Sequence, residues 1–254
     1  MTAPRLSDEY RLVELDEIDS TNEEAKRLAI AGAEEGTLVW AHRQTAGRGR
    51  RGRGWTSRQG NLFTSLIIRP YCAPLEAAQF TFAAALAVRD MVAVHLKNDI
   101  EVACKWPNDV LVEGRKVSGI LLESSTAGKG NVEWLVLGVG INLSHHPAIE
   151  GRHPSTSLKD EGAGDILPAL ALEQFTQAFS RHWQAWREGG FQPIHAAWLE
   201  HAFGLGESAR IKLEGGEYSG RFIGIDECGA LRLKAEGCGE KLFSAGDVTF
   251  GESG

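Results

Sequence analysis

Cysteine is scarce in this sequence, and its four cysteines lie far apart. Cys72, Cys104, Cys228 and Cys238 show no C-x-x-C spacing and no accompanying histidine pattern. A structural zinc site or a compact disulfide framework requires such spacing, so both are disfavoured. We therefore expect a cytoplasmic protein with reduced thiols.

Long hydrophobic runs are absent as well. The most apolar stretch, residues 80–96, is interrupted by Arg89 and Asp90 and is short for a bilayer span. Residues 1–10 contain no apolar segment that could form the core of a secretory signal. We therefore expect neither membrane insertion nor secretion.

The chain also lacks an excess of positive charge, since its formal net charge is -7 and its pI is near 5.7. This balance argues against general affinity for nucleic acid or anionic membranes. One segment inverts it: residues 44–55, here called the arginine loop, contain four arginines, four glycines and no acid. Glycines let a backbone approach a ligand, and guanidinium groups match carboxylate and phosphate oxygens. The loop is therefore a candidate anion-binding site, with a flexible nucleic-acid-binding loop as the alternative.

The 254 residues suffice for one large domain and a small appended one. Expected strands are residues 11–18, 37–41, 62–69, 101–105, 109–112, 116–123 and 132–139. Expected helices are residues 21–31, 74–97, 172–188 and 193–203. Ser20 and Glu23 have capping-box spacing before the first helix. Because several strands are joined by short turns, the predicted fold class is α+β, with a mixed, largely antiparallel sheet flanked by helices.

The residue pattern of the sequence changes after Gly206. Short alternating segments at 209–213, 218–225, 230–233 and 240–243 are separated by glycine-containing turns. This pattern is typical of a small β-barrel of roughly fifty residues. We expect a domain boundary near Leu205, which divides the chain into residues 1–205 and 206–254.

Three further stretches concentrate side chains with chemical uses: residues 105–110 (KWPNDV), 116–123 (KVSGILLE) and 138–143 (GVGINL). The first places a cation, an amide and a carboxylate at the mouth of a strand. The second begins with a lysine and contains a glycine that permits close approach of a ligand. The third ends an apolar strand with glycines and an asparagine. Each stretch alone also has a structural explanation, as a turn or a strand end.

Jointly and in this order, these stretches resemble the catalytic domain of biotin protein ligases, also called biotin–[acetyl-CoA-carboxylase] ligases. The resemblance covers nearly the whole chain, from residues 20–22 through the arginine loop to the terminal segments 224–226 and 229–231. It implies a class II synthetase-like catalytic domain at residues 1–205 and an SH3-like β-barrel at 206–254. It also implies the reaction: biotin and ATP, with Mg²⁺, form biotinyl-5′-AMP, and biotin then passes to a lysine of a biotin carboxyl carrier protein or domain.

That chemistry brings two anions together, so preorganised cations should supply most of the acceleration. The resemblance implies that Lys116 contacts the biotin carboxylate and the α-phosphate, and that Arg48 and Arg50 lie over biotin and the adenylate. Asp109 completes the expected catalytic set, either near Mg²⁺ or orienting Lys116 or Arg48.

The resemblance implies two further sets of ligand-binding positions. The biotin-binding positions are Ser20, Thr21, Asn22, Gln44, Gly47, Arg48, Gly49, Arg50, Lys116 and Gly119. The ATP-binding positions are Arg50, Arg51, Arg53, Trp55, Asn108 and Asn142. For Ser20, a role as helix N-cap explains the residue equally well.

The expected partner is the biotin carboxyl carrier protein, and the family makes a homodimer plausible. DNA binding is not expected, because the catalytic segments begin almost at once. Two alternatives stay open. A lipoate–protein ligase would perform a parallel adenylation on another acid, and a nucleic-acid-binding module would use the arginine loop on phosphates.

Overall fold

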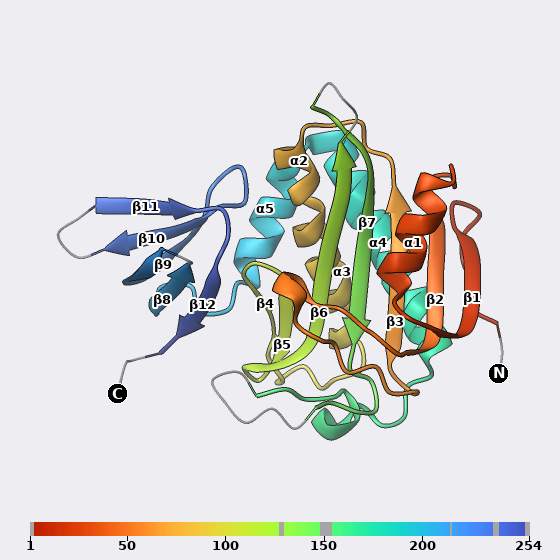
Figure 1. The fold of residues 1–254 in the computed structure, drawn as a ribbon. Helices are drawn as coiled ribbons and strands as arrows, with labels where there is room; N and C mark the ends of the chain where they lie inside the picture. Colours follow the sequence, from red (N-terminus) through yellow and green to blue (C-terminus); the bar gives the residue numbers. More distant parts are fainter. Residues whose placement is uncertain (1–2, 127–129, 148–153, 214, 236–238, 252–254) are drawn as a thin grey trace.

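The computed structural model describes residues 3–126, 130–147, 154–213, 215–235 and 239–251, so Cys238 lies outside the described residues. The chain forms two sheets with helices packed on the larger one (Figure 1). The larger sheet has seven strands in the order β1-β2-β3-β7-β6-β5-β4. Their bounds are β1 Arg11–Ile18, β2 Thr37–Gln44, β3 Leu62–Ile68, β4 Val102–Lys105, β5 Asp109–Val112, β6 Arg115–Thr126 and β7 Val132–Ile141.

Only β1 and β2 pair in parallel among these strands; the other neighbours are antiparallel. The predicted mixed, largely antiparallel sheet is therefore confirmed. The central strands β3 and β7 are almost wholly buried, because helices cover both of their faces. Apolar residues consequently run through these strands without the alternation of a half-exposed sheet.

Helix α1 (Thr21–Ile30) covers one face of the large sheet, where Ala25 and Ala29 pack on Val39, Ile67 and Val136. Helices α3 (Phe80–Ala93) and α4 (Pro168–Gly189) cover the other face, and α5 (Phe191–Glu200) packs beside them (Figure 1). A short helix α2 (Pro74–Ala78) precedes α3. Among the described residues, no helix is both long and apolar enough to cross a membrane.

The sequence predicted one helix over residues 74–97, and this prediction is wrong in two respects. The structure has two helices separated at Gln79, and the second ends at Ala93. At the break, the Gln79 N–H donates to the carbonyl of Glu76 only three residues back, and the Gln79 side chain accepts a hydrogen bond from Trp186 Nε1. Tertiary contact with α4 thus overrides a locally continuous helical pattern.

The capping box predicted for Ser20 and Glu23 is also wrong. Ser20 is the N-cap residue of α1, but its side chain makes no capping hydrogen bond. Glu23 instead pairs with Lys26 and Arg48. The Ser20 hydroxyl is thus not used in holding the helix end.

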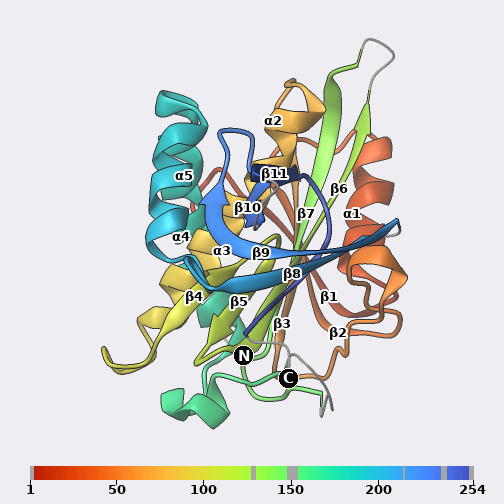
Figure 2. The same cartoon turned by 90° about the vertical axis from the view of Figure 1, so that its left-hand side faces the viewer.

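The second sheet contains β8 Ser208–Leu213, β9 Gly216–Ile225, β10 Leu231–Ala235, β11 Gly239–Phe243 and β12 Asp247–Phe250, in the order β11-β10-β9-β8-β12. All its pairings are antiparallel. The sequence did not predict β12, which closes against β8. Figure 2 looks onto this C-terminal sheet and shows β8 and β9 crossing in front of the large sheet.

One turn of the C-terminal sheet fixes it to the larger body. Trp106 donates its indole N–H to the carbonyl of Gly229 at 3.0 Å. Phe82 of α3 lies against the same glycine and packs edge-on against Phe191 and Trp198 of α5. Gly229 has φ +86, and a Cβ built there would lie 2.6 Å from Phe82 Cε2. The turn therefore requires glycine both for its conformation and for its close packing.

We expect Gly229→Ala to destabilise the protein more than Gly206→Ala does. Gly206 has the same φ of +86 but nothing within 4 Å of a built Cβ, so it controls for backbone strain alone. The difference in unfolding free energy should be about 1–3 kcal/mol, because the new methyl group must displace a buried aromatic ring. Urea unfolding of both variants measures it, and equal losses would contradict the packing argument.

Candidate active site

A cleft of about 740 Å³ lies where the large sheet, the arginine loop and the C-terminal sheet meet. Its floor comes from β6 and β7, one wall from the start of α1 and the end of β2, and the opposite wall from β8, β9 and β12. A volume of this size falls within the range of small-molecule sites.

The cleft brings together fourteen of the sixteen site residues predicted from the sequence. These are Ser20, Thr21, Asn22, Gln44, Arg48, Gly49, Arg50, Arg53, Trp55, Asn108, Asp109, Lys116, Gly119 and Asn142. Gly47 and Arg51 do not line it. A Cβ on Gly47 would lie 2.5 Å from Ser57 Oγ, so this glycine allows the loop to fold upon itself. Arg51 turns toward Asp247 of the C-terminal sheet.

A polar cluster lies at the start of α1. Gln44 Oε1 accepts hydrogen bonds from the Thr21 backbone N–H at 2.8 Å and from the Thr21 hydroxyl at 3.1 Å. Gln44 Nε2 donates to Ser57 Oγ at 2.8 Å, which fixes the orientation of the amide. Ser20 is buried beside this cluster and lines the cleft. These side chains form a preorganised polar end for a ligand that both donates and accepts hydrogen bonds.

Asn22 occupies a space that only glycine leaves open on β7. A Cβ on Gly138 would lie 1.9 Å from Asn22 Oδ1. Ser65 donates to that same oxygen at 2.6 Å, and the Asn22 amide donates to Glu123 at 2.9 Å. The side chain is thereby held against the sheet at the floor of the cleft.

Trp55 lies across two other glycines of the floor. A Cβ on Gly140 would lie 2.6 Å from the indole, and one on Gly119 would lie 3.0 Å from it. Lys116 Nζ lies 5.5 Å from the centre of the Trp55 ring, within the range of a cation–π contact. The glycine pattern in residues 116–123 and 138–143 therefore leaves room for an aromatic ring above the sheet.

Lys116 forms an ion pair with Asp109, with Nζ 2.6 Å from Oδ1. The pair joins the first residue of β5 to β6, and both side chains are largely buried at the cleft. The amino group thus points into the cleft, with a carboxylate fixing its direction.

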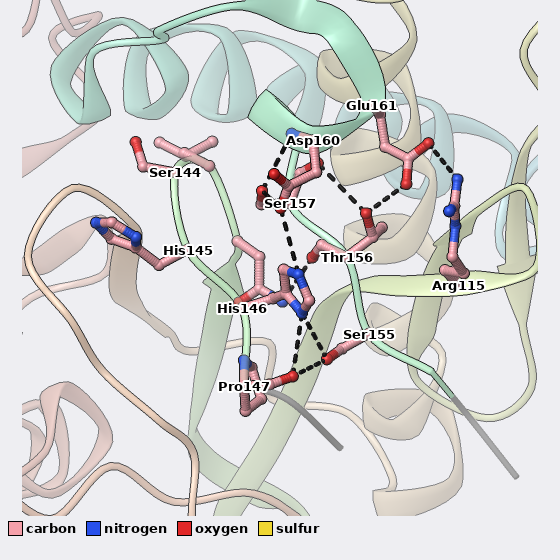
Figure 3. A network of polar contacts seen from close by, with 12 residues as sticks. Arg115, Ser144, His145, His146, Pro147, Ser155, Thr156, Ser157, Asp160 and Glu161 are labelled. Atoms are coloured by element: carbon pink, nitrogen blue, oxygen red, sulfur yellow. Dashed lines mark hydrogen bonds and ion pairs between the residues drawn. The ribbon is translucent and has the colours of Figure 1, made fainter. Parts of the chain in front are cut away.

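The backbone of Lys116 is held from the other side by residues 154–156. Its N–H donates to the carbonyl of Pro154 at 2.8 Å, and its carbonyl accepts from the N–H of Thr156 at 2.9 Å. Figure 3 shows the network that anchors this segment, in which Thr156 donates to Glu161 and His146 contacts Ser155 and Asp160. These contacts fix the segment behind Lys116.

The four arginines of the loop contact three other parts of the chain, and Arg51 and Arg53 share Asp247 of β12. Arg48 pairs with Glu23 of α1, while Arg50 donates to Asn108 Oδ1 at 2.9 Å. Burial lowers the pKa of Arg50 from its usual value, although Asp247 and Asp109 oppose this effect. A guanidinium remains protonated even so, and the loop therefore presents fixed cations to the cleft.

Two features of the site are absent from the set of site residues predicted from the sequence. The first is Lys105, which lines the cleft and is only 6% exposed. Burial, together with the nearby charge of Lys116, lowers its pKa to about 8, against the opposing influence of Asp109 and Asp247. Its position in the KWPNDV stretch was the available signal.

The second missed feature is the wall contributed by the C-terminal sheet. It consists of Arg210, Lys212, Glu217, Asp247, Val248 and Thr249. No local motif marks these residues, because they reach the cleft only through the packing of the two sheets.

Asn142 extends the floor on the β7 side. Its amide donates to the carbonyl of Thr156 at 3.0 Å, while its buried Oδ1 has no hydrogen-bond partner within the part of the chain that the structure describes. A buried acceptor that lines a cleft is a candidate for a ligand contact.

The described residues include no cluster of three or more His, Cys, Asp or Glu side chains suited to a metal ion. Mg²⁺ differs from zinc in needing no such cage, because one or two carboxylates with substrate phosphates suffice. Asp109 is a carboxylate that lines the cleft, where it pairs with Lys116.

Comparisons with known proteins agree over nearly the full chain. Residues 15–142 match the biotin/lipoate A/B protein ligase family, and residues 204–251 match the biotin protein ligase C-terminal domain. A biotin–[acetyl-CoA-carboxylase] ligase of Paracoccus denitrificans is 43% identical over 238 residues, which cover 92% of this chain and 98% of that protein. The bifunctional ligase/repressor BirA of Bacillus subtilis is 35% identical over 244 residues, covering 94% and 74%.

Among solved structures, the biotin protein ligase from Aquifex aeolicus in complex with biotin and ATP superposes with a TM-score of 0.80. The two chains are 29% identical, and the match covers 96% of this chain and 99% of that one. The same fold therefore holds biotin and ATP in that relative.

The buried amine of Lys105 predicts a pH-dependent contribution to stability. Its folded-state pKa of about 8 is lower than the pKa of an unfolded lysine. Between these two values the unfolded state holds more protons, so stability rises with pH through this window. Relative to Lys105→Met, the wild type should gain about 2–3 kcal/mol of unfolding free energy from pH 8 to 10.5. Urea titrations across that range measure the gain, and a pH-independent difference would contradict it.

Proposed function

Because the chain belongs to the biotin/lipoate A/B protein ligase family, we propose that it activates biotin with ATP and transfers biotin to a protein lysine. The first step forms biotinyl-5′-AMP and releases pyrophosphate. In the second step the lysine amine of a biotin carboxyl carrier protein or domain attacks the acyl carbon of biotinyl-5′-AMP. AMP leaves, and the amine loses a proton. The observation that carries the proposal is the convergence of Lys105, Lys116, Arg48, Arg50 and Arg53 on one cleft that also contains the Gln44 polar cluster.

The first step needs this concentration of cations. A biotin carboxylate oxygen attacks the α-phosphorus, and the bond to the pyrophosphate oxygen breaks. Two anions must therefore approach while negative charge builds on the phosphoryl oxygens. Lys116 is proposed to contact both the carboxylate and the α-phosphate, with Arg48 and Arg50 over the forming adenylate. Fixed cations stabilise that transition state without having to reorganise.

The polar cluster is proposed to bind the ureido ring of biotin. That ring offers N–H donors and a carbonyl acceptor, which Ser20, Thr21 and Gln44 complement. The absence of a capping hydrogen bond from Ser20 supports this use of its hydroxyl. Asn22, Gly119 and the backbone around Gly47 and Gly49 complete the proposed biotin site.

ATP is proposed to bind between the arginine loop and the C-terminal sheet. Arg50 and Arg53 would face the phosphates, Asn108 would orient Arg50, and Trp55 and Asn142 would contact the adenosine. Arg51, which was predicted to share the phosphate-binding role, does not line the cleft and pairs with Asp247. Mg²⁺ would enter with ATP, with the phosphates as its main ligands and Asp109 as a candidate carboxylate. We propose the domain division predicted from the sequence: residues 1–205 carry out the ligase chemistry, and residues 206–254 form a small β-sheet domain.

A cytoplasmic location is proposed because the cysteines that the structure describes, Cys72, Cys104 and Cys228, are all free thiols. A homodimer formed at the edge of the large sheet remains a prediction, for which β1 provides an outer strand. Binding of nucleic acid by the arginine loop loses support, because Arg48 pairs with Glu23, and Arg51 and Arg53 pair with Asp247.

Pyrophosphate release tests the substrate assignment. The purified protein should release pyrophosphate from ATP when biotin is added, because only a carboxylic acid that fits the Gln44 cluster can attack the α-phosphate. Lipoate, which lacks the ureido ring, should give a rate at least about tenfold lower, since unpaired polar groups would remain in the site. Release with lipoate and not with biotin would contradict the proposal.

Replacement of Lys116 tests the mechanism. We expect Lys116→Ala to reduce biotin-dependent pyrophosphate release by about a hundredfold or more, because one fixed cation contributes roughly 3 kcal/mol to such a transition state. Lys234→Ala is the matched control, since Lys234 is exposed on β10 and lies outside the cleft. Circular dichroism would verify that both variants fold. Near-normal release from a folded Lys116→Ala variant would remove Lys116 from the mechanism.

A further inference from the structure

Asp247 connects the C-terminal sheet to the arginine loop. It is the first residue of β12 and lines the cleft. Its Oδ2 lies 3.1 Å from Arg51 Nη1 and also pairs with Arg53 Nη2. One carboxylate thus joins two guanidinium groups that precede it by nearly two hundred residues in the sequence.

The loop is a tight turn at the point where Asp247 holds it. Its backbone folds back through a hydrogen bond from the Gly49 N–H to the Arg53 carbonyl at 2.7 Å and a bridge between Arg48 and Gly54. Arg51 adopts φ 56 and ψ 35, a left-handed conformation that L residues with side chains rarely take. Such a conformation persists where surrounding contacts fix it, and the ion pair with Asp247 is a contact of that kind.

The charge of Asp247 also reaches beyond the two arginines that it contacts. It acts on Arg50 and on the buried Lys105, favouring the protonated form of each. The carboxylate therefore interacts with four cations, of which Arg50, Arg53 and Lys105 line the cleft. In a cleft that contains no phosphate, it offsets part of the repulsion among those cations.

We propose that Asp247 is a positioning residue, which holds the tip of the arginine loop at the cleft mouth before the nucleotide binds. ATP then meets an ordered loop, and its phosphates bind Arg50 and Arg53 without first having to order the chain. Ordering a loop during binding lowers affinity, so preorganisation by Asp247 strengthens the binding of ATP. Only the identity of the nucleotide rests on the function proposed above; the loop contact itself does not.

Limited trypsin digestion without any substrate tests the contact directly, because trypsin cleaves after arginine and the loop contains four. Asp247→Asn should accelerate cleavage within residues 48–53 by about three- to tenfold. This factor corresponds to the stabilisation expected from two partly exposed ion pairs, which the variant loses. Asp247→Glu should restore part of the protection, and high salt should abolish the difference between Asp247→Asn and wild type.

Glu240→Gln is the matched control. Glu240 pairs with Arg232 on the same sheet at a similar exposure, 39% for each side chain, but it does not line the cleft. This variant should leave loop cleavage unchanged. Equal cleavage rates of the loop in wild type and Asp247→Asn would overturn the proposal. Equal acceleration in Asp247→Asn and Glu240→Gln would also overturn it, as would cleavage of Asp247→Asn dispersed over the C-terminal sheet.

Kinetics provide a readout that general destabilisation would not give. In biotin-dependent pyrophosphate release, Asp247→Asn should raise the KM for ATP by about three- to tenfold and change kcat by less than about twofold. An unchanged or lowered KM for ATP would contradict the proposal. If the wild type released no pyrophosphate, the proposed function would fail, and the digestion experiment would still decide whether Asp247 holds the loop.

Discussion

Charge balance inside one cleft is the constraint on which the rest of the structure depends. The chain is acidic overall, yet seven lysine and arginine side chains line a single pocket among the described residues. Several are held by a carboxylate from another element: Arg48 by Glu23 of α1, Lys116 by Asp109 of β5, and Arg53 by Asp247 of β12. Without such partners, cations this close would repel one another and the arginine loop would be driven away from the sheet.

This arrangement explains why the site draws on both sheets. A reaction between a carboxylate and a triphosphate requires cations that are already in place, and each cation needs a temporary anionic partner. When substrates supply the negative charge, the phosphates can take over from the carboxylates at little cost in reorganisation. The glycines of β6 and β7 add the second requirement, since Gly119, Gly138 and Gly140 let Trp55 and Asn22 lie directly on the sheet.

Local patterns predicted most of the fold and the chemistry of the site. Strands such as Arg11–Ile18 and Asp109–Val112 followed from residue type and turn spacing, with bounds equal to those observed. The break at Gln79 and the strand β12 did not follow, because they depend on contacts with α4 and β8. Ser20 and Glu23 match a capping box locally, but Glu23 instead binds Lys26 and Arg48.

The same limit applies to the site. The arginine loop, Lys116 and Asn142 lie in recognisable motifs, whereas the cleft wall around Asp247 has no local signature and exists only because the two sheets pack together. Lys105 shows the intermediate case, since its motif was visible but its burial, and hence its lowered pKa, was not.

The central claim is that this cleft makes and retains an acyl adenylate. Native mass spectrometry of the protein after incubation with biotin and MgATP, without an acceptor, tests it most directly. The account predicts a complex whose added mass is that of biotinyl-5′-AMP, with pyrophosphate released into solution. A complex that contained only intact ATP and unmodified biotin after prolonged incubation would contradict it.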